Sequence, residues 1–177
     1  MRVEIDIPLI DEILDEWERQ VAGAFAGYRN HVYRMVNFTL AFADLDEEER
    51  KKVIIAGCFH DIGIWPGNNF DYLPPSIVRA KEYLGRNGVG DWSDEITRMI
   101  GEHHKVRRYT DAPIVEAFRK GDLVDFSLGI VKSGLPSSYV REVKAAFPNA
   151  GFHRNLVKVA AGWFCRHPLD PVPVIRW

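Results

Sequence analysis

The chain has 177 residues, of which 46% are hydrophobic and 27% are charged, and this is the composition of an ordinary globular domain. Its 23 Lys and Arg residues nearly balance its 25 Asp and Glu residues, so it lacks the basic excess expected of a nucleic-acid-binding protein. It has no uninterrupted apolar run long enough to cross a membrane, and its two cysteines are too few for a disulfide framework. We therefore expect one domain over residues 1–177, located in the cytoplasm, with no nucleic-acid or membrane partner.

Helical periodicity dominates the first part of the sequence. Over residues 10–21 the apolar side chains fall three or four positions apart, which predicts one face of a helix. A second helix is expected over about residues 28–42. A third begins after Asp46, because Asp46 with Glu49 three residues later forms the pattern of a capping box. Residues 53–59 of this third helix are apolar almost all round, so we expect it to be central and buried.

The helical pattern continues in the rest of the chain. Glycines and prolines between residues 63 and 75 predict a loop. Further helices are expected over residues 76–84, 93–103, 113–128, 137–147 and 152–164. No segment shows the alternation of apolar and polar residues that is typical of a half-buried strand. The sequence therefore predicts an all-α fold, a single compact bundle of about seven or eight helices.

Histidines and aspartates are the residues with the clearest chemical meaning. His60 and Asp61 are adjacent at the end of the most apolar helix, where burial is costly unless both side chains find partners. His31 lies in the middle of the preceding predicted helix, and Asp122 lies in a later one. Imidazole and carboxylate groups together suit a divalent ion such as Mn, Fe, Co, Ni or Zn. The pattern indicates a metal site.

At these residues the chain resembles the HD-domain superfamily of metal-dependent phosphohydrolases. The signature of that family is a histidine, then an adjacent His-Asp pair, then a distant aspartate, each on a different helix. The matching segments are residues 30–34, 59–63 and 121–125. The last of them is similar to the family's Ala-Asp-x-Leu-Asp element, with Gly121 and Val124 as departures. The resemblance covers about residues 28–130 and implies an HD-domain-like fold.

The resemblance also implies a role for individual residues. His31, His60, Asp61 and Asp122 correspond to the four protein ligands of a divalent metal ion, for which Mg is a further candidate. One ion per chain is favoured over two. Asp125, one helical turn after Asp122, would orient a ligand rather than bind the ion.

A pair of adjacent histidines, His103 and His104, ends a later predicted helix. Side chains of adjacent residues on a helix point about 100° apart, so we expect only one of the two to face the site. That histidine would bind a second ion in part or contact the substrate.

For catalysis we expect Asp61 to hold the nucleophile, while His104 and Lys105 neutralise charge on a phosphoryl group. The residues expected to bind the substrate are Arg34, His103, Lys105 and Arg108. Some nucleotidase branches of the family carry a catalytic glutamate three residues after the aspartate of the His-Asp pair. Ile64 stands at that position here, so that role does not transfer.

The resemblance implies a metal-dependent hydrolase that acts on a small phosphorylated metabolite or nucleotide, a phosphomonoester or phosphodiester, by attack of metal-bound hydroxide. Its partner would be a small anionic substrate, and the sequence leaves a homodimer open. Two other enzyme classes share the scaffold, namely metal-dependent hydratases or lyases and di-iron oxygenases. The oxygenases need two further histidine ligands, so the shortage of histidines between Asp61 and Asp122 argues against them. A non-catalytic regulatory module that binds a metal or ligand is an alternative of a different class.

Overall fold

Helices form the whole of the regular secondary structure in the computed structural model, which describes residues 1–67, 69–169 and 173–174. Within these residues there is no strand, and eight α-helices have eight or more residues, so the predicted all-α bundle is confirmed. Those eight are α1 (Pro8–Asp15), α3 (Phe25–Leu40), α4 (Glu47–Phe59), α5 (Leu73–Arg86), α6 (Ser93–Glu102), α7 (Pro113–Phe126), α8 (Ser137–Ala146) and α9 (Phe152–Arg166). The shorter pieces are the single turn α2 (Glu18–Val21) and the 3₁₀ turns η1 (Ala22–Ala24), η2 (Ile62–Ile64) and η3 (Gly90–Trp92).

The helix predicted over residues 10–21 is interrupted. α1 ends at Asp15, and the chain becomes helical again only at Glu18. Ile10, Ile13 and Leu14 on α1 and Val21 on α2 are nevertheless all buried, so the apolar face continues across the break. The interruption therefore leaves the same apolar side of the segment packed on the core.

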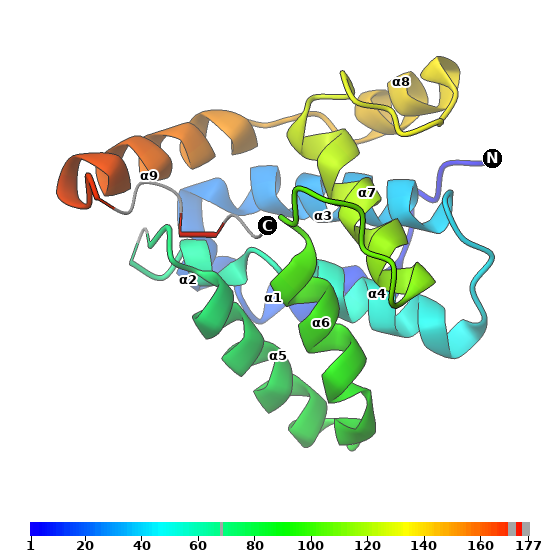
Figure 1. Ribbon diagram of the computed structural model, residues 1–177, viewed down its shortest axis with the longest axis horizontal. Helices are drawn as coiled ribbons and strands as arrows, with labels where there is room; N and C mark the ends of the chain where they lie inside the picture. Colours follow the sequence, from blue (N-terminus) through cyan, green and yellow to red (C-terminus); the bar gives the residue numbers. More distant parts are fainter. Residues whose placement is uncertain (68, 170–172, 175–177) are drawn as a thin grey trace.

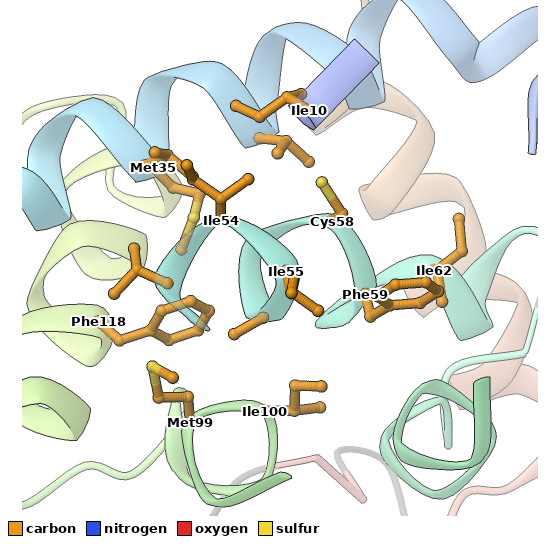
Figure 2. Close-up of a cluster of buried hydrophobic side chains, with 14 of the residues drawn as sticks. Ile10, Met35, Ile54, Ile55, Cys58, Phe59, Ile62, Met99, Ile100 and Phe118 are labelled. Carbon is orange, nitrogen blue, oxygen red and sulfur yellow. The ribbon is translucent and has the colours of Figure 1, made fainter. Parts of the chain in front are cut away.

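α4 is the central helix, as its composition predicts. Its first turn carries the expected capping box, in which the Glu49 backbone N–H donates to the Asp46 carboxylate at 2.8 Å and the Asp46 N–H donates to Glu49 at 3.1 Å. Every residue from Val53 to Phe59 is buried. Figure 2 shows Ile54, Ile55 and Phe59 of α4 among side chains from the surrounding helices, including Ile10, Met35, Met99, Ile100 and Phe118.

α3 connects the two sides of the bundle (Figure 1). It packs on α1 and α4 and is crossed by α7, while α8 and α9 lie along its other side. The crossing with α7 is close at Gly121. A Cβ atom added there would overlap Thr39 Oγ1 and lie 2.8 Å from the Met35 carbonyl oxygen. Glycine therefore allows the α7 backbone to reach the α3 backbone beside Asp122.

No helix in the described part of the chain is both long and apolar enough to cross a membrane.

Candidate metal centre

Four side chains predicted to bind metal meet where α3, α4 and α7 come together. His31 lies on α3, Asp122 lies on α7, and His60 and Asp61 directly follow the last residue of α4. His31 Nε2 lies 2.9 Å from His60 Nε2, 3.6 Å from Asp61 Oδ2 and 3.8 Å from Asp122 Oδ1. His60 Nε2 lies 3.5 Å and 3.7 Å from the same two carboxylate oxygens. All four side chains are buried and face one small volume.

Hydrogen bonds on the outer side fix how the histidine rings point. His31 Nδ1 donates to Asp125 Oδ2 at 2.7 Å, and His60 Nδ1 donates to the Gly57 carbonyl at 2.8 Å. His103 repeats the pattern, since its Nδ1 donates to the Ile100 carbonyl at 2.7 Å. With Nδ1 occupied, each ring turns Nε2 toward the cluster. Metal-binding histidines in proteins are held in this way.

The structure confirms that Asp125 orients His31 and corrects the role expected for Arg34. The Arg34 guanidinium bonds both oxygens of Asp125, with Nε at 2.5 Å and Nη2 at 2.8 Å. Its Nη1 donates to the carbonyls of Phe147 and Pro148 at 3.0 and 3.2 Å. With 2% of its surface exposed, Arg34 has no route to a substrate. It neutralises Asp125, so the predicted phosphate contact is wrong.

Both adjacent histidines face the site, so the expectation that only one would do so is also wrong. The two residues lie at the C-terminal end of α6, which ends at Glu102 and has His103 as its cap. The two rings lie 3.9 Å apart between centroids. His103 Nε2 lies 3.6 Å from Asp61 Oδ1, and His104 Nδ1 lies 4.0 Å from Asp122 Oδ2.

These six residues form three overlapping triads, each with ligand atoms within 4.8 Å of one another. The triads are His31, His60 and Asp122; His60, Asp61 and His103; and His103, His104 and Asp122. In the described part of the protein, Asp61 Oδ1 and His103 Nε2 are buried with no hydrogen-bond partner. Buried polar atoms are almost always paired, so two facing acceptors left unpaired fit a cation between them. The buried clusters can therefore hold a metal ion, and their donor set suits a divalent transition metal.

The carboxylates determine the charge of the cluster without an ion. Burial alone would lower the pKa of His60, but Asp61 and Asp122 outweigh it and raise that pKa from 6.5 to about 9. Burial would raise the pKa of Asp61, whereas His60, His103 and His31 together hold it well below its usual range. For His104, burial and the neighbouring His103 lower the pKa to about 3. The site therefore has a neutral imidazole at His104 and charged carboxylates beside it.

A cavity of about 400 Å³ opens beside the cluster. One end is polar and includes His103, His104, Asp122 and Lys105. The remaining wall is mostly apolar and is formed by Phe70, Tyr72, Val106, Leu123, Phe126, Leu156, Val157, Ala160 and Val174, with Arg119 among them. Lys105 thus lies where a substrate contact was predicted, with its Nζ 3.3 Å from Glu102. The cavity gives the cluster access to a small molecule.

Arg108 does not line this cavity. It lines a second one, of about 390 Å³, together with Phe42, Tyr109 and Lys120 among others. The structure therefore does not support the predicted contact between Arg108 and a substrate at the His/Asp cluster.

Two aromatic contacts at the site concern His31 and His104; the aromatic loop 65–72 was expected to form a pocket rim, and Phe70 and Tyr72 do line the cavity, whereas Phe152 was not predicted from the sequence. The Phe152 ring stacks on His31, with centroids 4.0 Å apart and planes inclined by 10°. The Tyr72 hydroxyl donates to His104 Nε2 at 2.5 Å. Neither contact has a signal in the sequence, because each partner lies on a segment far along the chain. His153, next to Phe152, bonds the backbone carbonyls of Asp125 and Phe126 and points away from the cluster.

No protein-family model, curated protein or solved structure matches this chain. Over its described residues the chain is an all-α protein with buried His/Asp clusters that can bind metal.

Proposed function

We propose that this protein is a metal-dependent phosphohydrolase that acts on a small phosphorylated compound. The observation that carries the proposal is the convergence of His31, His60, Asp61 and Asp122 beside a cavity that a small molecule can enter. These four residues would hold the principal ion, and the likeness of their order to the HD-domain signature supports the same assignment. When bound, a divalent ion supplies a water of lowered pKa and stabilises negative charge on phosphoryl oxygens.

The remaining tasks fall to side chains at the polar end of the cavity. Asp61 has one oxygen toward His31 and His60, while its Oδ1 has no hydrogen-bond partner within the described residues. This oxygen would accept a hydrogen bond from the attacking water and so orient it. Lys105 would neutralise a phosphoryl oxygen, and His104, held by Tyr72, would direct its ring toward the same group.

Metal content measured by mass spectrometry tests the proposal directly. The untagged protein, purified without added metal, should contain about one divalent ion per chain, and Asp61→Ala should lose it. Asp91→Ala is the matched control, because Asp91 is an exposed carboxylate outside the cluster. It should keep the wild-type metal content and the wild-type activity on a panel of phosphomonoesters. A protein that takes up no divalent ion, even after incubation with Mn, Fe, Co, Ni and Zn, would refute the proposal.

A second candidate function is a di-iron oxygenase. The orientation of the adjacent histidines favours it, because His103 and His104 together with the four predicted ligands bring six donor residues to one cluster. Two irons per chain, with oxygen consumption that Asp61→Ala abolishes, would select this candidate. A single ion with phosphomonoesterase activity would select the hydrolase.

A further inference from the structure

The cavity beside the cluster differs sharply between its two ends. Its polar groups gather around His103, His104, Asp122 and Lys105. The apolar wall is built by Leu123 and Phe126 of α7, where the Phe126 ring lies 6.1 Å from the His104 ring between centroids, and by Leu156, Val157 and Ala160 of α9. None of these five side chains can form a hydrogen bond. A ligand that fills the cavity therefore meets polar partners mainly beside the His/Asp cluster and apolar side chains over the rest of its surface.

Three of the wall residues are large apolar side chains that remain exposed. The exposed fractions are 58% for Val106, 50% for Phe126 and 67% for Val157. They come from three separate segments, the loop after α6, the end of α7 and the middle of α9, yet they line one cavity. Exposed apolar side chains that gather around a cavity indicate a surface that an apolar ligand covers.

The charges at the polar end suit an anion with a single phosphoryl group. Two of the described residues that line the cavity are cationic, Lys105 and Arg119. Arg119 is held by two hydrogen bonds, from Nε and Nη2 to the Glu116 carboxylate at 2.8 and 2.9 Å, whereas Lys105 Nζ has a single longer contact, 3.3 Å from Glu102. The several negative charges of a polyphosphate would therefore have Lys105 and the ion held by the cluster as their main positive partners. Lys105 and that ion are enough to neutralise one phosphate monoester group.

The apolar end argues against a nucleoside as the rest of the substrate. The hydroxyls of a ribose and the polar edges of a base would face Leu123, Leu156 and Ala160 without partners. An unpaired polar group that loses its water weakens binding. An alkyl or aryl group gains from the same contacts, because its burial removes apolar surface from water.

From this arrangement we infer that the substrate is a phosphate monoester of a compact, apolar alcohol, with its phosphoryl group near His104 and Lys105 and its alkyl or aryl body against α7 and α9. The inference rests on the proposed hydrolase function. Hydrolysis would form a bond from water oxygen to phosphorus and break the bond from phosphorus to the ester oxygen. The leaving alcohol takes up one proton from water, and inorganic phosphate is the second product.

The cavity volume sets the size of this substrate. About 400 Å³ corresponds to roughly thirteen water molecules at about 30 Å³ each. Octyl phosphate has about as many non-hydrogen atoms. The inference therefore predicts a gain in binding with chain length up to about eight carbons and little gain beyond.

A chain-length series tests the inference. The Mn-loaded protein is assayed with ethyl, butyl, hexyl, octyl and dodecyl phosphate, each below its micelle concentration, and with adenosine monophosphate. We expect kcat/KM to rise about fourfold for each methylene up to octyl phosphate, which is the gain from burying one methylene group. Adenosine monophosphate should be a poorer substrate than butyl phosphate.

Two variants of α9 locate the effect. Ala160→Phe places a ring in the cavity and should lower the ratio of octyl to ethyl phosphate turnover at least tenfold. Ala161→Phe makes the same substitution at the next residue, which is exposed and does not line the cavity, so it should keep the wild-type ratio. Thermal melting of both variants checks that they fold. An equal ratio in both variants would overturn the placement of the apolar body.

Binding of alkylphosphonates, which are not hydrolysed, separates this inference from the proposed function. If no ester is hydrolysed but the Kd of ethyl- to octylphosphonate falls about fourfold per methylene, the apolar site stands and the hydrolase proposal fails. If ethyl phosphate and adenosine monophosphate are hydrolysed without any gain from chain length, the hydrolase stands and the apolar site is refuted. Absence of both binding and hydrolysis refutes both.

Discussion

Replacing Gly121 by alanine tests the close crossing of α3 and α7 on which the cluster is built. The new Cβ would overlap Thr39 Oγ1 and lie 2.8 Å from Met35 O and 2.9 Å from Thr39 N, and the last two are backbone atoms that cannot rotate away. Overpacking of this kind costs about 1–3 kcal/mol. Alanine regains about 0.5–1 kcal/mol of helix propensity. We therefore expect a net loss of about 1–2 kcal/mol.

Thermal unfolding followed by circular dichroism measures this loss. For a chain of this length 1 kcal/mol corresponds to about 2–4 °C, so Tm should fall by about 2–8 °C. Gly85→Ala on α5 is the matched control, because a Cβ there meets no atom within 4 Å, and its Tm should rise slightly. Adding Thr39→Ala to Gly121→Ala should restore part of the loss, since it removes the overlap with Oγ1 but not the two backbone contacts. A Gly121→Ala variant as stable as Gly85→Ala would refute the reasoning.

Three further predictions concern the core and the cluster. Arg34→Ala leaves the buried Asp125 carboxylate without its bidentate partner, so urea denaturation should show a loss of about 3–5 kcal/mol, and an unchanged midpoint would contradict the pairing. Burial, with Glu4 and Glu142, raises the pKa of Tyr139 from 10.0 to about 12, so the folded chain holds this proton more tightly than the unfolded chain. The resulting stability is complete below pH 10 and is lost as pH rises toward 12. Between pH 10 and pH 12 the urea midpoint should therefore fall more in the wild-type protein than in Tyr139→Phe. Equal falls in the two proteins would count against the raised pKa of Tyr139. Removing the metal with a chelator should lower Tm by about 5–10 °C, because an ion whose concentration is about a hundred times its Kd stabilises the fold by about 2.7 kcal/mol. An unchanged Tm would speak against a bound ion.

Local patterns in the sequence were enough to predict the helices. Apolar periodicity, the capping box at Asp46 and the prolines and glycines between segments place each long helix within a few residues of its bounds. The break between α1 and α2 has no such signal, because the apolar spacing through Trp17 and Val21 continues as though the helix were unbroken. Periodicity reports which side chains face the core. It does not report whether the backbone between them bends.

Contacts between helices at the site could be predicted only in part from patterns within single helices. His31, His60, Asp61 and Asp122 come together as their order along the chain predicted. Arg34 lies on the same face of α3 as His31, and that made it a candidate for the substrate. Its actual partner is Asp125, on a helix far along the chain, and only the crossing of α3 and α7 shows that the two residues neutralise each other.

The prediction that only one of the adjacent histidines faces the site was wrong for a different reason. The expectation for His103 and His104 assumed a helix that continues through both, whereas α6 stops one residue earlier. Helix ends are the least certain part of any assignment from sequence. At this helix end both histidines reach the cluster, His103 beside Asp61 and His104 beside Asp122.

The distribution of the cluster over four segments affects how the chain acquires an ion during folding. A nascent chain that has emerged as far as Ala112 already carries five of the six donor residues, including the triad His60, Asp61 and His103, but it lacks α7 with both Asp122 and Asp125. Until α7 docks on α3, one carboxylate ligand is missing and nothing holds Nδ1 of His31. The two triads that contain Asp122 are therefore completed late in folding. At saturating metal, ion uptake by these triads should proceed at the rate of helix docking rather than rise with metal concentration.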